Sequence, residues 1–238
     1  MNRLVNLYKS NVGKKVIAAI TGLILFGFLL GHVTGNLKAF MPHPSDGVPH
    51  IDEYAHFLRV IGEPMVPPEG VLWGARLVLL VSVVLHMVVV IQLAMQSTEA
   101  RPIGYVKKKR KMASFSALYM MFSGLLIAFF VVFHILHFTA GVLPFGDFKE
   151  GEVYHNLYKS FSADYFAIPI FYVVTMIVIG FHLNHGVWSL FQTLGFDNPD
   201  RNKMLRIATT IVTVIIVVGF IAVPLSFLSG QMPEPPVK

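Results

Sequence analysis

Cysteine is absent from this 238-residue chain, and charged residues make up only 13% of it. Without thiols the chain can form no disulfide, can ligate no iron–sulfur cluster through thiolates, and can attach no haem covalently through a C-x-x-C-H motif. The sequence also lacks a nucleotide-binding fingerprint, a nucleophile paired with a base, and an arginine cluster suited to dicarboxylates. These absences exclude a soluble dehydrogenase or hydrolase domain.

Hydrophobic residues make up 55% of the chain and the mean hydropathy is +0.65, values typical of an integral membrane protein. Long apolar stretches with few charges predict transmembrane helices. The sequence predicts one all-α integral membrane domain over residues 1–238, with five spans at about 13–40, 71–97, 112–141, 165–194 and 204–228.

The basic residues predict the orientation of these spans. Most of the 19 lysines and arginines lie in the N-terminal segment, in the link after the second span, where KKKRK occupies 107–111, and in the link after the fourth span. The links 38–70 and 142–164 instead hold most of the acidic residues. The positive-inside rule places the N-terminus in the cytoplasm and the C-terminus outside a bacterial cytoplasmic membrane. The basic run is then a topology signal or a docking surface for an acidic partner, and nucleic acid is not expected as a partner.

The first outer link contains a further helical pattern. Within HIDEYAHFLRVIG at 50–62, apolar residues recur at helical spacing, which predicts a short amphipathic helix on the outer face. The histidines of this link, His43, His50 and His56, are expected to be solvated.

Each of the first four spans carries a histidine in apolar surroundings: His32, His86, His134 and His182. Polar groups in hydrocarbon are costly, so they usually have a partner or a ligand. One such histidine would more often be a hydrogen-bonded packing residue. Four, with one on each span, favour axial ligation of haem iron within a helical bundle.

The depths of these histidines divide them into two pairs. At a rise of 1.5 Å per residue, His32 and His134 lie roughly 8 to 10 Å toward the outside of the membrane midplane. His86 and His182 lie about 3 to 5 Å toward the cytoplasm. This predicts two non-covalent haems b, on the order of 12 Å apart in depth, with an outer His32–His134 pair and an inner His86–His182 pair. The alternative is a membrane transporter or structural protein whose histidines relay protons.

Glycines accompany the predicted ligands. Gly22 and Gly124 each precede a predicted outer ligand by ten residues, and Gly180 and Gly186 flank His182. Such small residues would let a flat macrocycle approach a helix backbone. Helix–helix packing through small residues is the alternative, and on its own it explains the glycines better.

Three further residues are candidates for contacts with the cofactors. His137 and His185 each lie three residues past a predicted ligand, one turn nearer a membrane surface. Each is predicted to bind haem propionates or a quinone, and hydrogen bonding to a neighbouring helix is the alternative. A register in which His137 replaces His134 as the ligand is also considered. Arg76 is a candidate propionate partner, with snorkelling to the outer interface as its alternative.

Four motifs resemble the cytochrome b558 subunit of succinate:quinone oxidoreductase, the five-helix, two-haem membrane anchor also found in fumarate reductases. They are TGLxLxxFxxxH in the first span, a histidine followed six residues later by glutamine in the second, FHxLHF in the third, and FHxxHGxWSLFQTLG in the fourth. The similarity covers all five spans. Its most specific part places His182 four residues before Gly186 and six before Trp188.

The resemblance implies that His32, His86, His134 and His182 ligate two haems b, in the pairing that the depths also give. It implies partners on the cytoplasmic side: a flavoprotein carrying FAD, which holds the dicarboxylate active site, and an iron–sulfur subunit. Electrons would then pass to a quinone, usually menaquinone in two-haem members. Some members carry an acidic residue two positions before the fourth ligand, but this chain has Gly180 there. A cytochrome b anchor of a quinone-linked formate dehydrogenase or hydrogenase is the rival interpretation.

Overall fold

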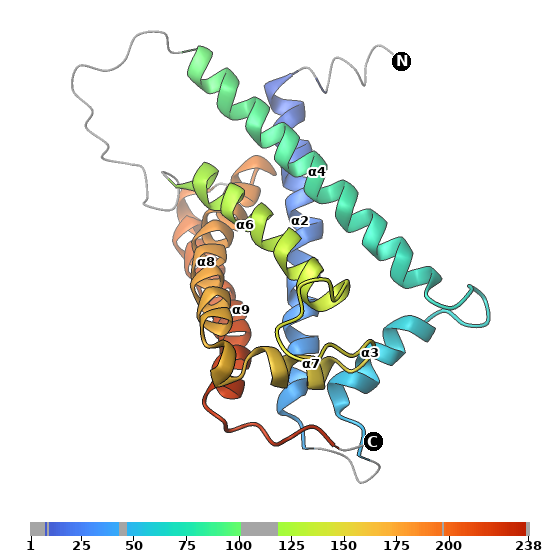
Figure 1. Cartoon of the computed structure of the whole chain (residues 1–238). Coiled ribbons are helices and arrows are strands. Elements are labelled where there is room, and N and C mark those ends of the chain that lie inside the picture. The colour runs from blue at the N-terminus through green and yellow to red at the C-terminus, as the bar shows by residue number, and fades with distance from the viewer. Residues whose placement is uncertain (1–7, 9, 43–46, 101–118, 197, 237–238) are drawn as a thin grey trace.

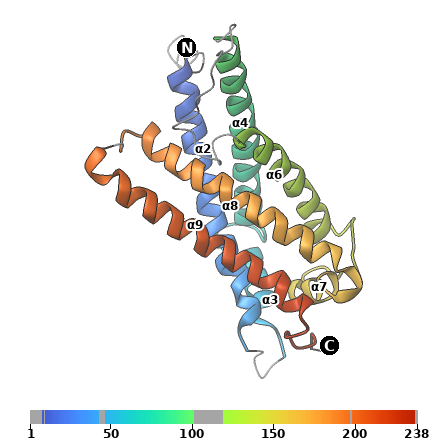
Figure 2. The same ribbon diagram turned by 90° about the vertical axis from the view of Figure 1, so that its left-hand side faces the viewer.

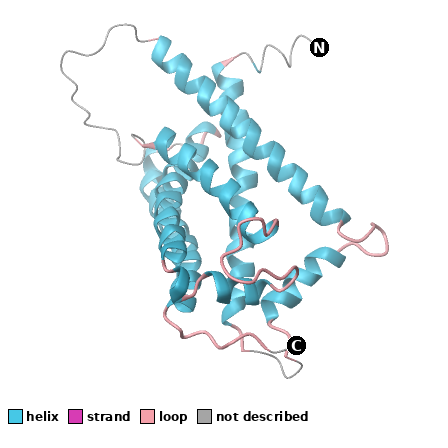
Figure 3. Ribbon diagram, in the orientation of Figure 1, coloured by secondary structure: helices cyan, strands magenta, loops and turns pink. Residues whose placement is uncertain are grey.

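All regular secondary structure in the described part of the chain is helical (Figure 1; Figure 3). The computed structural model describes residues 8, 10–42, 47–100, 119–196 and 198–236. Five helical segments within it are long and apolar enough to cross a membrane. They are α2 (Asn11–Asn36) with the 3-10 turn η1 (Leu37–Phe40), α4 (Gly70–Glu99), α6 (Met120–His134) with the π-helical turn η2 (Ile135–Thr139), α8 (Ala167–Thr193) and α9 (Pro199–Leu228). The chain is therefore an all-α, multi-pass integral membrane protein.

The five predicted spans are confirmed as five long apolar helices. Most of the predicted ends lie within a few residues of the helix ends in the structure. The predicted start of the third span, at 112, lies outside the described residues. The fifth helix begins at Pro199 rather than at 204, because Asn198 caps it: its side chain accepts a hydrogen bond from the Asp200 backbone N–H. Hydropathy alone does not detect the polar first turn of this helix.

The helix α8 lies at the centre of the packing. It contacts α9 along its length and also contacts α6 and α2, while α4 packs mainly against α2 (Figure 2). A Cβ atom on Gly180 would lie 2.9 Å from Val217 Cγ2 of α9, so only glycine permits this close approach. Gly180 therefore serves helix packing, which is the alternative role considered for the glycines in the sequence analysis.

Many apolar side chains of the spans point away from the bundle. On α4, Leu77, Val81 and Val84 are more than half exposed. On α9, by contrast, a stripe that includes Ile216, Phe220 and Val223 is buried. Exposed apolar side chains on helices of this length are expected where hydrocarbon, rather than water, surrounds the protein.

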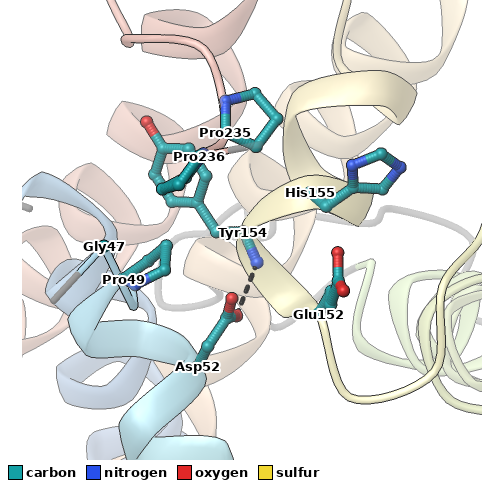
Figure 4. Close-up of a pocket in the computed structure, with 8 residues that line it drawn as sticks. All are labelled: Gly47, Pro49, Asp52, Glu152, Tyr154, His155, Pro235 and Pro236. Atoms are coloured by element: carbon teal, nitrogen blue, oxygen red, sulfur yellow. Dashed lines mark hydrogen bonds between the residues drawn. The ribbon is translucent and has the colours of Figure 1, made fainter. Parts of the chain in front are cut away.

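Two short helices lie at the end of the molecule where the C-terminus is found (Figure 1). The predicted amphipathic helix is confirmed as α3 (His50–Val60), whereas α7 (Val153–Ser160) was not predicted. Asp52 Oδ1 accepts a hydrogen bond of 2.9 Å from the Tyr154 backbone N–H (Figure 4), and the Tyr154 hydroxyl donates to the Pro233 carbonyl. These bonds join α3, α7 and the C-terminal tail into a cap.

Tyr154 is fully buried at the centre of this cap. Burial, together with the neighbouring Tyr158, raises the pKa of Tyr154 to about 12, so its hydroxyl stays protonated and able to donate. The cavity beside it has a volume of about 10 Å³, roughly the room for one water molecule (Figure 4).

Candidate functional site

The predicted outer pair comes together in the structure. The ring centroids of His32 on α2 and His134 on α6 lie 5.8 Å apart, with an interplanar angle of 82°. Phe28 stacks on His32 and Phe130 stacks on His134, while Phe220 of α9 also contacts His32. Two imidazoles that ligate one metal ion from opposite sides have centroids about 6 Å apart, because each metal–nitrogen bond is about 2 Å. The spacing of the outer pair therefore suits a shared metal ion.

Tyr172 of α8 links His134 to His137. Its hydroxyl lies 3.2 Å from His134 Nδ1 and 2.9 Å from His137 Nδ1. A hydroxyl has one proton, so it donates to one ring and accepts from the other. When Tyr172 accepts from Nδ1–H of His134 and donates to His137, Nε2 of His134 is the nitrogen that can bind a metal ion.

His137 itself is almost completely buried, with 1% of its surface exposed. It lies in the π-helical turn η2, and its Nε2 is 2.9 Å from the Ser160 hydroxyl of α7. Both ring nitrogens are thus hydrogen bonded within the chain, which matches the alternative proposed for this residue. These bonds favour His134 over His137 as the ligand, and a propionate or quinone role for His137 stays a prediction.

In the predicted inner pair, His86 of α4 is held by α2. Its Nδ1 lies 3.1 Å from the Ala18 carbonyl oxygen and 3.1 Å from Thr21 Oγ1. The Thr21 hydroxyl itself donates to the Ile17 carbonyl at 2.7 Å. Because a carbonyl can only accept, Nδ1 of His86 carries the proton. In the neutral ring Nε2 then has a free lone pair.

His182 of α8 is held by α6 in the same way. Its Nδ1 lies 3.0 Å from Ser123 Oγ, and the Ser123 hydroxyl donates to the Met120 carbonyl at 3.0 Å. The hydroxyl has one proton, and when it donates that proton to Met120 its oxygen accepts from Nδ1–H of His182. In that arrangement Nε2 of His182 is unprotonated.

A glycine follows each of these hydroxyl residues. A Cβ atom on Gly22 would lie 3.3 Å from His86 Cε1, and one on Gly124 would lie 3.5 Å from His182 Cε1. We call Thr21–Gly22 and Ser123–Gly124 the imidazole seats. Contact with a macrocycle and helix packing were the two roles considered for these glycines, and in the structure each borders the histidine ring of the neighbouring helix.

The remaining candidates lie nearer the helix ends. Arg76 lies over the Trp73 ring at 4.7 Å, and its role toward a propionate stays a prediction. His185 is half-buried on α8, and its role toward a propionate or quinone stays a prediction. Trp188, part of the fourth-span motif, is covered by the Arg206 guanidinium at 4.3 Å. In the first outer link, His56 is exposed and His50 bonds Glu53, while His43 lies outside the described residues.

Sequence reasoning missed the residues that hold the histidines: Thr21, Ser123, Tyr172 and Ser160. One signal could have found two of them. The tripeptides TGL at 21–23 and SGL at 123–125 stand at the same distance before His32 and His134. This marks a weak internal repeat in which a hydroxyl residue and glycine precede a histidine on the same helix.

No protein-family model matches this chain, and neither does any curated protein or solved structure. The arrangement of the site is therefore the main guide to its chemistry. It brings His32 and His134 together among aromatic side chains, and it anchors Nδ1 of His86 and of His182 to a neighbouring helix, an arrangement in which Nε2 can bind a metal ion.

Proposed function

We propose that this protein is the dihaem cytochrome b membrane anchor of a succinate:quinone oxidoreductase or fumarate reductase. The observation that supports the proposal is the orientation of the inner histidines, whose Nδ1 atoms are hydrogen bonded to Ala18, Thr21 and Ser123. A histidine that only packs against a neighbouring helix needs no such uniform tautomer. An axial ligand does need it, because the metal ion takes the lone pair on Nε2.

The surroundings of the histidines fit haem b. Neutral imidazole is a common axial ligand of haem iron, and the stacked Phe28 and Phe130 provide flat apolar surfaces of the kind that a porphyrin contacts. His32 and His134 would hold the outer group, and His86 and His182 the inner one. A bound haem supplies a one-electron carrier. The residues of this chain fix its ligands, its depth and its apolar surroundings.

The partners belong to the same proposal. The resemblance of the four motifs supports a flavoprotein with FAD and an iron–sulfur subunit on the cytoplasmic side, and a quinone, menaquinone by preference, as electron acceptor. The clustered basic residues support a cytoplasmic N-terminus in a bacterial cytoplasmic membrane. The lysines of the run at 107–111 lie outside the described residues, and their docking role stays a prediction.

The direct test is the reduced-minus-oxidised absorption spectrum of the complex purified in detergent. The proposal predicts the α band of a low-spin haem b, together with copurification of a FAD-containing subunit. A proton-relaying transporter would show no α band. A cytochrome b anchor of a formate dehydrogenase or hydrogenase would show the band but would copurify with a different catalytic subunit.

A further inference from the structure

The two imidazole seats occupy equivalent positions in two helix pairs. Thr21 lies eleven residues before His32 on α2, and Ser123 lies eleven residues before His134 on α6. The seat on α2 holds His86 of α4, the next long helix, and the seat on α6 holds His182 of α8 in the same manner. The pairs α2–α4 and α6–α8 thus repeat one arrangement.

In both seats the hydroxyl has the same pattern of hydrogen bonding. Each hydroxyl donates backward to a carbonyl of its own helix, Ile17 for Thr21 and Met120 for Ser123. Its oxygen is then left to accept from an imidazole N–H. Both seats are buried, with 5% of Thr21 and 6% of Ser123 exposed, so water does not compete for these bonds.

We propose that Thr21 and Ser123 are positioning residues that tune the electron affinity of the inner haem iron through His86 and His182. The inference rests on the proposed function. An acceptor at Nδ1–H increases the basicity of the ligating nitrogen, which stabilises the oxidised iron more than the reduced iron. Loss of either hydroxyl should therefore make the inner haem easier to reduce.

The two hydroxyls should differ in the size of their effect. His86 keeps a second acceptor, the Ala18 carbonyl, when the Thr21 hydroxyl is removed. For His182, the Ser123 hydroxyl is the one acceptor found at Nδ1 among the described residues. Replacement of Ser123 should consequently shift the potential more than replacement of Thr21.

The experiment is a potentiometric titration of the purified complex, followed through the haem α bands, with Thr21→Val and Ser123→Ala. Ser123→Ala should change the equilibrium constant for reduction of one haem by about three- to tenfold, toward easier reduction. A tenfold change corresponds to about 59 mV for a one-electron couple. Thr21→Val should move the same haem by less, and the other haem should keep its potential in both variants.

Restored and control variants separate tuning from general damage. Thr21→Ser and Ser123→Thr retain the hydroxyl and should return the potential to the wild-type value. Thr175→Val removes a buried hydroxyl that donates to the Phe171 carbonyl of its own helix, and it should leave the inner haem unchanged. Should a variant lose the inner haem, its recovery in the hydroxyl-retaining variant would support the positioning role.

Three results would overturn the inference. The first is an unchanged potential in Ser123→Ala with both haems present. The second is a shift that Ser123→Thr fails to reverse, and the third is a shift of different haems by the two variants. A wild-type complex with no haem spectrum would instead overturn the proposed function itself, so the two failures are distinguishable.

Discussion

At the scale of single residues, the tautomers of the histidines follow from where hydroxyl protons go. A threonine or serine in a helix commonly donates to a carbonyl one turn earlier, and Thr21 and Ser123 both do so. Their oxygens then act as acceptors for a ring on the neighbouring helix. A small polar residue in an apolar helix thereby determines which nitrogen of a histidine is free.

Tyr172 provides a test at this scale. Tyr172→Phe removes the hydroxyl that bonds both His134 and His137, so Nδ1 of each ring loses this partner. We expect the free energy of unfolding to fall by about 1–3 kcal/mol. Unfolding of the purified protein in a detergent series measures this change.

The control for Tyr172→Phe is Tyr165→Phe, since Tyr165 is 39% exposed. This substitution should have little effect on stability. Equal stability of the two variants would contradict the bridging role of the Tyr172 hydroxyl.

At the scale of elements, the glycines of α2 have different tasks. A Cβ on Gly22 would contact the His86 ring, and one on Gly35 would collide with the Tyr54 ring of α3. Gly27 and Gly31 meet nothing within 4 Å among the described residues. The spacing of glycines along the sequence therefore does not reveal which of them border a functional side chain.

Gly22 and Gly27 form a matched pair for a test. Gly22→Leu places a bulky side chain against His86 and should displace the imidazole, so we expect loss of the inner haem with retention of the outer one. Gly27→Leu changes the same helix to the same degree but faces open space, and it should retain both. Haem content per chain measures the difference. Equal loss of haem in the two variants would contradict the role of Gly22 in seating the His86 imidazole.

At the scale of the whole molecule, long-range bonds close the end where the C-terminus lies. Asp52 and Tyr154 are 102 residues apart in sequence, and Tyr154 reaches a further 79 residues to Pro233. The Ser160 hydroxyl extends this cap inward to His137 and, through Tyr172, to His134. The cap is thus connected by hydrogen bonds to the predicted outer pair.

Tyr154→Phe tests the connection to the tail. Without the bond to Pro233, we expect the backbone amides of Gly230 and Gln231 to exchange hydrogen about fivefold faster, equivalent to about 1 kcal/mol. The hydrogen bond needs the protonated phenol, whose pKa burial raises from 10.0 to about 12. Its contribution is therefore complete below pH 10 and is lost as the pH rises through about 12.

The control for this variant is the pH dependence itself. The difference in exchange between wild type and Tyr154→Phe should stay constant from about pH 6 to 9. A difference that disappears within this range would contradict the account of Tyr154.

The sequence predicted the spans and α3 because hydropathy and helical periodicity are local properties of a chain. It also placed His32 near His134, since a constant rise per residue converts position into depth. It did not predict α7, whose eight residues are held by the distant Asp52. Nor did it predict the partners of His137, because Tyr172 and Ser160 meet it only through tertiary packing.

The central claim is that four imidazoles hold two haems, and counting haem b per chain by the pyridine haemochrome method tests it most directly. The account predicts two haems in the wild-type complex and one each in His134→Ala and His182→Ala. The double variant should contain none, and His56→Ala, at an exposed position on α3, should retain two. A wild-type complex with one haem or none would contradict the account.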